Sequence, residues 1–325
     1  MEKRVLGKTG IEVSRIGFGV LPIGASQMDL TVEEGSELLL YAIEKGITLF
    51  DTAQYYDTYR FMRPAFEMLK KASSRSPKDV IVSSKCLYGE RQSMIDAVEE
   101  ARRELDRDVI DIFLLHEVRS AADLEMRRPA LEYLTEAREK GIVKAIGLST
   151  HHQDVCALSA EIPELDIVFP LINKNGLGIR CGEGAGTAEG MKESIGKCAA
   201  AGKGMYAMKV FGGGNLTGEY MECLDYVDAI DGMASMVIGF TNIEEIDRAC
   251  EYADGTIDRT YSPDISGKKM YINKEDCEGC GSCKARCPND AIFVSSDGLM
   301  EIDHDICLTC GYCAPVCPTR ALIMY

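Results

Sequence analysis

Eight cysteines toward the C-terminal end of the chain stand in two runs with identical spacing. Each run reads Cys-x-x-Cys-x-x-Cys-x-x-x-Cys-Pro. Cysteine thiolates bind soft metal ions and iron–sulfur clusters, and three thiolates two residues apart fit one turning loop around a shared centre. The spacing therefore predicts a metal centre. The eight residues are Cys277, Cys280, Cys283, Cys287, Cys307, Cys310, Cys313 and Cys317.

Three kinds of site could use these cysteines: structural zinc, disulfides or iron–sulfur clusters. Zinc usually takes two separated pairs of ligands, which a tight run of four with a trailing proline suits poorly. The runs resemble the bacterial ferredoxin motif for two [4Fe–4S] clusters, in which the fourth cysteine of each run ligates the other cluster. The resemblance implies one cluster bound by Cys277, Cys280, Cys283 and Cys317, and another bound by Cys307, Cys310, Cys313 and Cys287.

Four polar residues in the first part of the chain follow apolar runs and have complementary chemistry: Asp51, Tyr56, Lys85 and His116. A tyrosine can donate a proton, and its pKa responds to a nearby ammonium group. A carboxylate can anchor that ammonium group, and a histidine can orient a carbonyl oxygen. The set predicts acid–base chemistry rather than ordinary polar strand ends.

The elements that must position these residues alternate between short apolar strands and segments with helical periodicity. Nearly continuous apolar strands are typical of a parallel sheet buried on both faces. Eight strand–helix units predict an α/β fold of the (β/α)8 TIM-barrel type, whose chemistry lies at the carboxyl ends of the strands. A doubly wound sheet would open with a Gly-rich turn, which Gly17-x-Gly19 does not complete. We expect a hairpin over 2–13, strands over 14–19, 47–52, 80–85, 110–116, 143–150, 167–173, 204–210 and 235–240, and helices near 31–45, 60–72, 91–106, 123–140, 152–161, 187–201, 219–230 and 242–253.

The segments 50–56, 84–85 and 115–116, which hold the four polar residues, resemble the Asp/Tyr/Lys/His tetrad of the aldo-keto reductases. Residues 141–149 resemble that family's fifth strand. In that family a nicotinamide delivers hydride to a carbonyl carbon while the tyrosine protonates the oxygen. The resemblance implies that Tyr56 is the general acid, that Lys85, anchored by Asp51, lowers its pKa, and that His116 orients the substrate carbonyl.

The expected cofactor pocket joins a Gly-rich loop after the seventh strand to the helix start after the eighth, where backbone N–H groups meet an anion. Family members that prefer NADP carry basic residues after the eighth strand, whereas this chain has Glu244 and Glu245. The family's nicotinamide-stacking aromatic matches Met208. We therefore expect NADH, NADPH or a flavin, with NADPH disfavoured by charge. The implied cofactor-binding residues are Ser149, Gly212, Gly213, Gly214, Gly239, Thr241 and Asn242.

The chain divides into three expected parts. Residues 1–253 form the barrel, 254–270 a linker and 271–325 a small α+β ferredoxin-like domain. A C-terminal extension covers the substrate in the aldo-keto reductases, so the cluster domain could roof the active site. The Gly-rich stretch 174–190 could form a mobile loop.

Charge and cysteine usage exclude several classes of partner. The formal net charge of −16 disfavours nucleic acid and anionic membrane surfaces, which need clustered Lys and Arg. The N-terminal residues lack the apolar core of a signal peptide, and no apolar stretch approaches membrane-spanning length. Fourteen cysteines without an export signal indicate reduced thiols, so we expect a cytoplasmic protein.

Hydride transfer moves two electrons together, whereas [4Fe–4S] clusters pass them one at a time. The leading hypothesis is an aldo-keto-reductase-like oxidoreductase that couples a small carbonyl or alcohol-type substrate to two clusters, with a ferredoxin or flavoprotein as electron partner. The first alternative is an NAD(P)H-dependent carbonyl reductase with a structural ferredoxin-like lid. The second is a non-catalytic electron-carrier subunit. Bound flavin or nicotinamide would separate the first two, and absence of both with an inert Tyr56 would favour the third.

Overall fold

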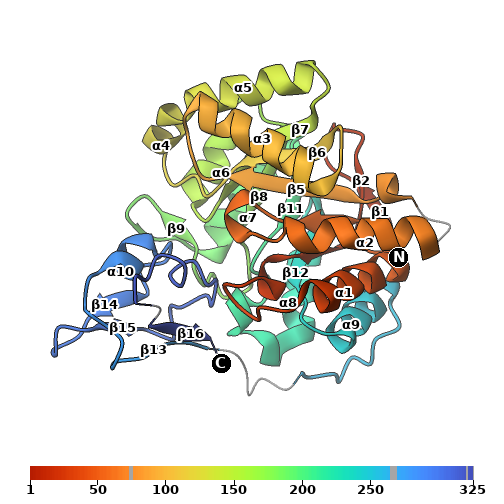
Figure 1. The fold of residues 1–325 in the computed structure, drawn as a ribbon. Coiled ribbons are helices and arrows are strands. Elements are labelled where there is room, and N and C mark those ends of the chain that lie inside the picture. Colours follow the sequence, from red (N-terminus) through yellow and green to blue (C-terminus); the bar gives the residue numbers. More distant parts are fainter. Residues whose placement is uncertain (73–75, 264–268, 320, 325) are drawn as a thin grey trace.

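Eight parallel strands close into a barrel in the computed structural model, which describes residues 1–72, 76–263, 269–319 and 321–324 (Figure 1). β12 closes the ring by pairing in parallel with β3. This arrangement confirms the predicted (β/α)8 barrel. The barrel strands are β3 (Ile16–Gly19), β4 (Leu49–Asp51), β5 (Ile81–Cys86), β6 (Ile110–Leu115), β7 (Val143–Thr150), β8 (Ile167–Pro170), β11 (Gly204–Ala207) and β12 (Met233–Gly239).

Side chains fill the barrel interior, so the strands are buried on their inner face as well as under the helices. β6 is buried at every position. Gly147 allows β7 and β8 to approach closely, since a Cβ there would lie 1.9 Å from the carbonyl oxygen of Ile167. Side chains of the apolar runs therefore alternate between the barrel interior and the layer of helices outside it, and both faces of the closed sheet are buried. The interior cluster includes Leu49, Ile112, Leu114, Ile167, Phe169 and Tyr206.

Helices surround the barrel and begin and end at the signals read from the sequence. Thr31 and Glu34 form a capping box at the start of the first helix, near the expected boundary at residue 31. Gly46 ends the first helix at φ 102°, and Gly141 has φ 71° after the fifth. The helices are α1 (Val32–Lys45), α2 (Tyr59–Ala72), α3 (Arg91–Leu105), α4 (Ala121–Met126), α5 (Arg128–Glu139), α6 (Gln153–Ser159), α7 (Ala188–Ala200), α8 (Tyr220–Asp228) and α9 (Ile243–Asp254).

One expected helix, 123–140, is two helices in the structure. α4 ends before Arg127, whose φ of −93° and ψ of 10° lie outside the helical region. Pro129 follows in the first turn of α5, where its missing N–H costs nothing. The Pro signal inside the expected helix therefore marks a new helix start.

The expected N-terminal hairpin is present as β1 (Lys3–Val5) and β2 (Glu12–Ser14), paired antiparallel. Its buried residues Leu6, Ile11 and Val13 join the apolar cluster of the barrel interior. The hairpin therefore seals one end of the barrel, which leaves the other end for the site. Among the described residues, none of the helices is both long and apolar enough to cross a membrane.

The cysteine-rich part forms a small α+β unit of two short antiparallel sheets. β13 pairs with β16, and β14 pairs with β15. Its apolar core includes Met270, Ile292 and Met300, with cysteines packed around them. Residues 264–268 of the expected linker, and Arg320 and Tyr325 of the expected domain, lie outside the described residues. The elements are β13 (Met270–Ile272), α10 (Ser282–Arg286), β14 (Ile292–Val294), β15 (Met300–Ile302) and β16 (Leu322–Met324).

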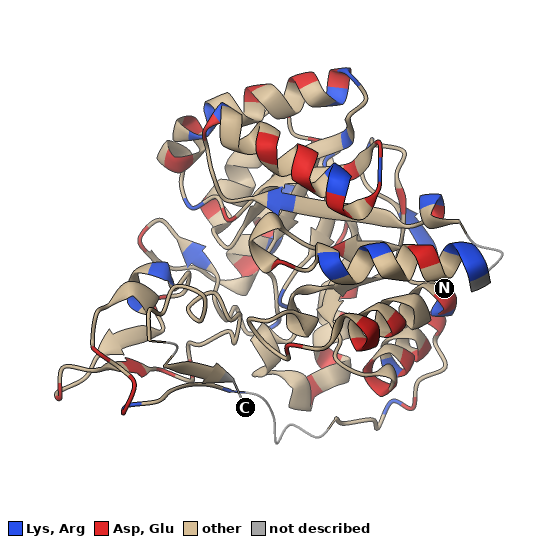
Figure 2. Ribbon diagram, viewed as in Figure 1, with Lys and Arg blue, Asp and Glu red and all other residues tan. Residues whose placement is uncertain are grey.

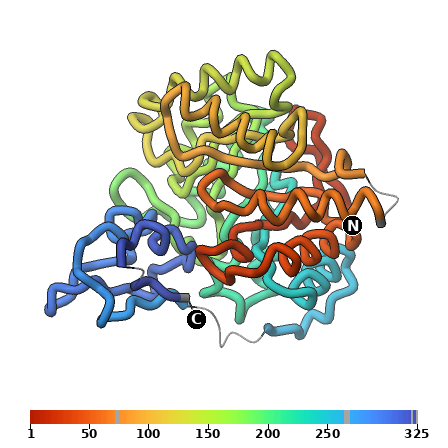
Figure 3. Tube along the Cα trace, viewed as in Figure 1, coloured from red at the N-terminus to blue at the C-terminus, as the bar shows by residue number. Residues whose placement is uncertain are grey.

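The two sheets of the small unit repeat each other with an offset of thirty residues. Met270 pairs with Met324, and the equivalent pair thirty residues away is Met300 with Val294. The cysteine runs repeat with the same offset, so the unit has internal two-fold pseudosymmetry. Figures 1 and 3 show this unit, in blue, lying against one side of the barrel. Figure 2 shows Asp and Glu spread over the outer helices, interspersed with Lys and Arg.

Candidate active site and cluster-binding sites

A buried ion pair joins the carboxyl ends of β4 and β5. The ammonium group of Lys85 donates to Asp51 Oδ2 at 2.7 Å and to the Thr52 carbonyl oxygen at 2.6 Å, and the two charged side chains are 1% and 6% exposed. Burial lowers the pKa of Lys85 and raises the pKa of Asp51, and each charge opposes the shift of the other. The pair forms the floor of the candidate site.

Three polar atoms meet above this pair: the hydroxyls of Tyr56 and Tyr312 and Nε2 of His116. The two hydroxyl oxygens lie 2.8 Å apart, and Nε2 lies 3.3 Å from Tyr56 and 3.0 Å from Tyr312. The Lys85 ammonium lies 5.1 Å from the centre of the Tyr56 ring. The structure thus brings together the four residues of the expected tetrad and adds a fifth.

The pKa of Tyr56 differs from the expectation. Burial raises it well above its usual value, and the negative charge of Asp51 adds to the rise. The expectation that Lys85 lowers the pKa is therefore wrong for this arrangement, because the Lys85 ammonium is committed to Asp51 and Thr52. Burial also lowers the pKa of His116 well below 6.5, with help from Lys85 and Arg286. The site holds a neutral phenol beside a neutral imidazole.

Tyr312 comes from the small unit, between Cys310 and Cys313. Its ring lies 4.6 Å from the Arg286 guanidinium carbon, and Arg286 pairs with Glu117 at 3.1 Å. The Tyr55 hydroxyl donates to the Tyr312 carbonyl oxygen at 3.2 Å. These contacts show that the small unit covers the barrel mouth, as we expected.

Sequence reasoning missed Tyr312, although the thirty-residue repeat carries a signal. The first run has Ser282 where the second has Tyr312, and Glu278 where the second has Leu308. Glu278 is exposed, whereas Leu308 is 1% exposed and belongs to the main core. When one copy of a repeat has apolar or aromatic residues where the other has polar ones, the apolar copy is expected to be the one buried against another part of the protein. Arg286 and Glu117 had no comparable signal, because their pairing spans distant parts of the chain.

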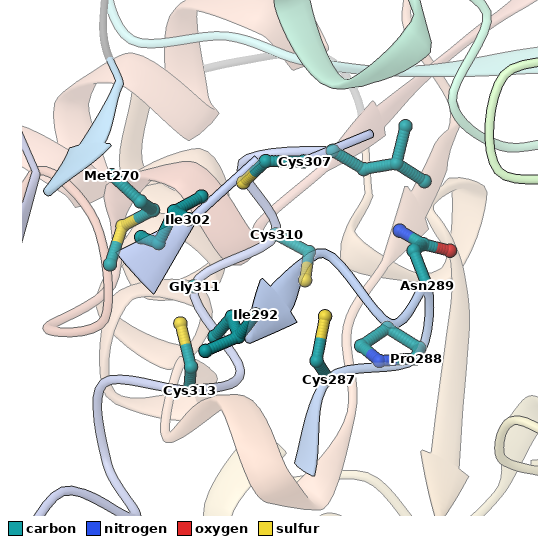
Figure 4. Close-up of a pocket in the computed structure, with 11 residues that line it drawn as sticks. Met270, Cys287, Pro288, Asn289, Ile292, Ile302, Cys307, Cys310, Gly311 and Cys313 are labelled. Carbon is teal, nitrogen blue, oxygen red and sulfur yellow. The ribbon is translucent and has the colours of Figure 1, made fainter. Parts of the chain in front are cut away.

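Four cysteines line one pocket of the small unit (Figure 4). Backbone N–H groups donate to two of the sulfurs, from Ala291 to Cys287 at 3.3 Å and from Thr309 to Cys307 at 3.4 Å. Met270, Ile292 and Ile302 supply apolar walls. Sulfur ligands, N–H donors and an apolar shell suit an iron–sulfur cluster. The four cysteines are Cys287, Cys307, Cys310 and Cys313, the cross-run set that the ferredoxin resemblance implied.

The other cross-run set also comes together. Burial raises the pKa of Cys283, and the nearby Cys317 and Cys277 raise it further. The Ala321 N–H donates to the Cys317 sulfur at 3.3 Å, as Ala291 does to Cys287. All fourteen cysteines are unpaired in the structure. Among the described residues, no three His, Cys, Asp or Glu side chains are arranged to hold a single metal ion.

The loop 212–214, which we expected to bind a cofactor phosphate, contacts the small unit and leaves no space there for a phosphate. A Cβ on Gly213 would lie 1.9 Å from the Leu308 carbonyl oxygen. Asn215 donates to the Cys307 carbonyl oxygen at 2.8 Å, and Lys209 donates to that of Leu308 at 3.5 Å. In this arrangement the loop binds the chain's own backbone.

The remaining expected cofactor residues also have internal partners. Glu245 accepts from the Thr241 N–H at 2.6 Å, so its carboxylate occupies the anion position at the start of α9. Asn242 caps that helix by accepting from the Glu245 N–H at 3.0 Å. Ser149 Oγ accepts from the Glu117 N–H at 2.9 Å, and a Cβ on Gly239 would lie 2.4 Å from Pro22. These groups do not fit a nicotinamide phosphate as arranged, and their cofactor role stays a prediction.

The chain is thus a (β/α)8 barrel protein with a buried polar group at the barrel mouth and a cysteine-rich unit over it. The model of the Aldo/keto reductase family matches residues 15–231, more than half of the chain, and that of a 4Fe-4S dicluster domain matches 270–324. The chain belongs to the aldo/keto reductase family, fused to a 4Fe-4S ferredoxin-type domain.

Curated relatives share the barrel part. A probable aldo-keto reductase 1 from Glycine max is 32% identical over 163 residues, which is 46% of this chain and 45% of the relative. An aldo-keto reductase from Bacillus subtilis (strain 168) is 29% identical over 160 residues, 46% and 47% of the two chains. A probable voltage-gated potassium channel subunit beta from Arabidopsis thaliana is 23% identical over 54% of each. The chain spans about half the length of these relatives.

Solved structures agree on the fold. A putative aldo-keto reductase from Pseudomonas aeruginosa superposes with a TM-score of 0.64 at 21% identity, over 78% of this chain and 94% of that one. The holo form of an aldo-keto reductase from Bacillus halodurans gives 0.61 at 18% identity, over 78% and 91%. At these identities the likeness shows the barrel fold alone.

Proposed function

We propose that the chain is an oxidoreductase that couples redox chemistry on a carbonyl or alcohol-type substrate in the barrel to electron transfer by two [4Fe–4S] clusters. One observation carries the proposal. Tyr312 lies between two cluster-ligand candidates, Cys310 and Cys313, and its hydroxyl contacts Tyr56 and His116. The residues that would bind a cluster and the residues that would protonate a substrate thus belong to one connected site.

In this proposal Tyr56 donates the proton to the substrate oxygen. Its raised pKa keeps the phenol protonated, so a proton is available when a substrate oxygen gains negative charge. Neutral His116 orients the same oxygen through Nε2. Lys85 and Asp51 form an ion pair beside the Tyr56 ring, and their charges set the electrostatic potential at the Tyr56 hydroxyl. Burial of the group excludes water, which strengthens each of these interactions.

The two cross-run cysteine sets would hold the clusters, which accept or release single electrons when bound. The two runs differ at one equivalent position: Cys280 of the first run is exposed, whereas Cys310 of the second is half-buried. We infer that an electron partner of the ferredoxin or flavoprotein type approaches at the first run. The proposed division of the chain is barrel 1–253, linker 254–270 and cluster domain 271–325. Thiolate ligands for clusters must stay reduced, so we propose a reducing compartment, the cytoplasm.

A second candidate is an NAD(P)H-dependent carbonyl reductase with the cluster domain as a structural lid. The family match of residues 15–231 and the covered barrel mouth favour it. Glu245 at the start of α9 disfavours NADPH, because a phosphate there would meet a carboxylate. A non-catalytic electron carrier is the third possibility.

Cluster reduction kinetics separate these proposals. We expect clusters in anaerobically reconstituted protein to be reduced quickly by dithionite or reduced ferredoxin, and slowly or not at all by NADPH. A stopped-flow trace of visible absorbance, with flavin and nicotinamide content determined on the same sample, is the measurement. Rapid bleaching by NADPH in flavin-free protein would contradict the expected order of donors. Carbonyl turnover with bound nicotinamide while the clusters keep their oxidation state would favour the second candidate.

A further inference from the structure

The hydroxyl oxygen of Tyr312 occupies a position with a specific chemical meaning. It lies 2.8 Å from the Tyr56 hydroxyl and 3.0 Å from His116 Nε2. Donors that stabilise a developing oxyanion lie about 2.7–3.1 Å from the place where that oxygen will be. If Tyr56 protonates the substrate oxygen and His116 orients it, both must reach a single oxygen atom. In this structure that atom belongs to Tyr312.

Tyr312 is firmly held in this position. It is 7% exposed, and its ring packs against Tyr55, Tyr56 and His116 with centroid distances of 5.7, 6.0 and 5.9 Å. Arg286 lies over the ring at 4.6 Å and is itself fixed by Glu117. A substrate oxygen and the Tyr312 hydroxyl therefore cannot share the site.

The segment around Tyr312 is bound to the barrel through its backbone. Consecutive carbonyl oxygens accept from side chains of two barrel loops: Cys307 from Asn215 and Leu308 from Lys209, both after β11, and Thr309 from Gln27, before α1. The Tyr312 carbonyl accepts from Tyr55. Because the ring itself is enclosed by Tyr55, Tyr56, His116 and Arg286, its departure from the site disturbs the segment 307–313 that carries it.

We propose that Tyr312 is an internal ligand of the barrel site, and that the site takes a small ring compound bearing a hydroxyl or carbonyl oxygen in its place. This inference rests on the proposed function only for the roles of Tyr56 and His116. The external ligand exchanges with the Tyr312 phenol, so its binding displaces the segment 307–313. Because that segment carries Cys307, Cys310 and Cys313, ligand binding and iron binding are linked, and each alters the affinity of the other equally.

The probe is p-cresol, the free phenol that corresponds to a tyrosine side chain. In anaerobically reconstituted Tyr312→Gly protein, calorimetry should detect one p-cresol site per chain, and toluene should bind about tenfold or more weakly because it lacks the hydroxyl. The double variant Tyr312→Gly/Tyr56→Phe should lose most of this preference. Tyr312→Phe is the matched control, since its ring still fills the site and p-cresol should not bind. Iron content is measured on every sample.

Wild-type protein gives an independent readout that does not depend on a glycine variant. Excess p-cresol should raise amide hydrogen exchange in the peptide covering 307–313 and leave exchange in β6 unchanged. Equal affinity for p-cresol and toluene, absence of binding to iron-loaded Tyr312→Gly, or unchanged exchange in the wild type would each overturn the inference. A Tyr312→Gly protein that binds p-cresol with the expected preference but never turns over any carbonyl would refute the proposed function and leave the internal ligand standing.

Discussion

The charges of Lys85 and Asp51 are almost wholly removed from water and compensate each other, and the Thr52 carbonyl oxygen accepts a further hydrogen bond from Lys85. Removing one partner of such a pair leaves an unpaired buried charge, which costs about 3–5 kcal/mol. Replacing both by apolar residues of similar volume is often neutral. A buried pair of this kind is weak evidence for stability, which fits the acid–base role proposed for it.

We predict that Lys85→Met lowers the free energy of unfolding by roughly 3–5 kcal/mol. The double variant Lys85→Met/Asp51→Leu should recover most of that loss. Anaerobic urea denaturation followed by circular dichroism is the measurement, and Arg91→Ala, which breaks the exposed pair with Glu136, is the control at about 1 kcal/mol or less. Additive losses in the double variant would contradict a compensated pair.

Tyr56 and its neighbour Tyr55 offer a matched comparison within one loop. Tyr56→Phe should abolish carbonyl turnover while iron content and fold stay intact, because only the proton donor is lost. Tyr55→Phe removes a hydrogen bond to the Tyr312 carbonyl and should retain turnover. Steady-state rates with iron analysis on both variants decide the matter. Equal rates in wild type and Tyr56→Phe would mean that another group donates the proton.

At the scale of elements, the cluster segment 307–313 and the loop after β11 are fitted to each other. Gly213 has φ 72° and no room for a side chain, because the Leu308 carbonyl would lie 1.9 Å from its Cβ. Gly214 has φ 109° and open space around it. Both glycines thus have a positive φ, but only at Gly213 would a side chain also collide with a neighbouring segment.

Gly213→Ala should push the segment 307–313 away from the barrel, whereas Gly214→Ala should leave it in place. Both variants suffer from an unfavourable φ, so the difference between them reports the clash alone. Hydrogen exchange of the peptide covering 307–313 should rise several-fold in Gly213→Ala only. Similar exchange in the two variants would show that the contact is not tight in solution.

The elements themselves were largely predictable, and the contacts between them were not. Apolar runs bounded by caps located the strands and helices, because burial and capping are local properties; only Pro129 divided one expected helix. The tetrad followed from a family resemblance and from strand ends. Tyr312 was missed because its contact with Tyr56 spans 256 residues. The raised pKa of Tyr56 was also missed, because burial depends on how the whole fold encloses the hydroxyl and not on the local sequence.

At the scale of the whole molecule, a pseudosymmetric unit is used asymmetrically. Its second run carries Leu308 and Tyr312 into the barrel, whereas its first run presents Glu278 and Cys280 outward. The two cysteine sets nevertheless remain interlocked, because each borrows its fourth member from the other run.

Cys287→Ala should therefore damage the set that contains Cys307, Cys310 and Cys313, although Cys287 is nearer in sequence to the other set. Cys317→Ala is the matched control and should damage the opposite set. Wild-type protein should hold about eight irons per chain. Iron analysis with electron paramagnetic resonance of each variant distinguishes the sets, and loss of the cluster nearest in sequence would contradict cross-ligation.

The interlocked cysteines also order events during synthesis. The last barrel strand ends at Gly239, but neither set is complete before Cys313, and the outward set needs Cys317. At about 5–20 residues per second, the ribosome reaches Cys317 roughly 4 to 16 s after Gly239. During that interval the nascent barrel can fold with its mouth still open, because Tyr312 has not yet been synthesised. On this order of synthesis, the clusters are inserted after the barrel has folded.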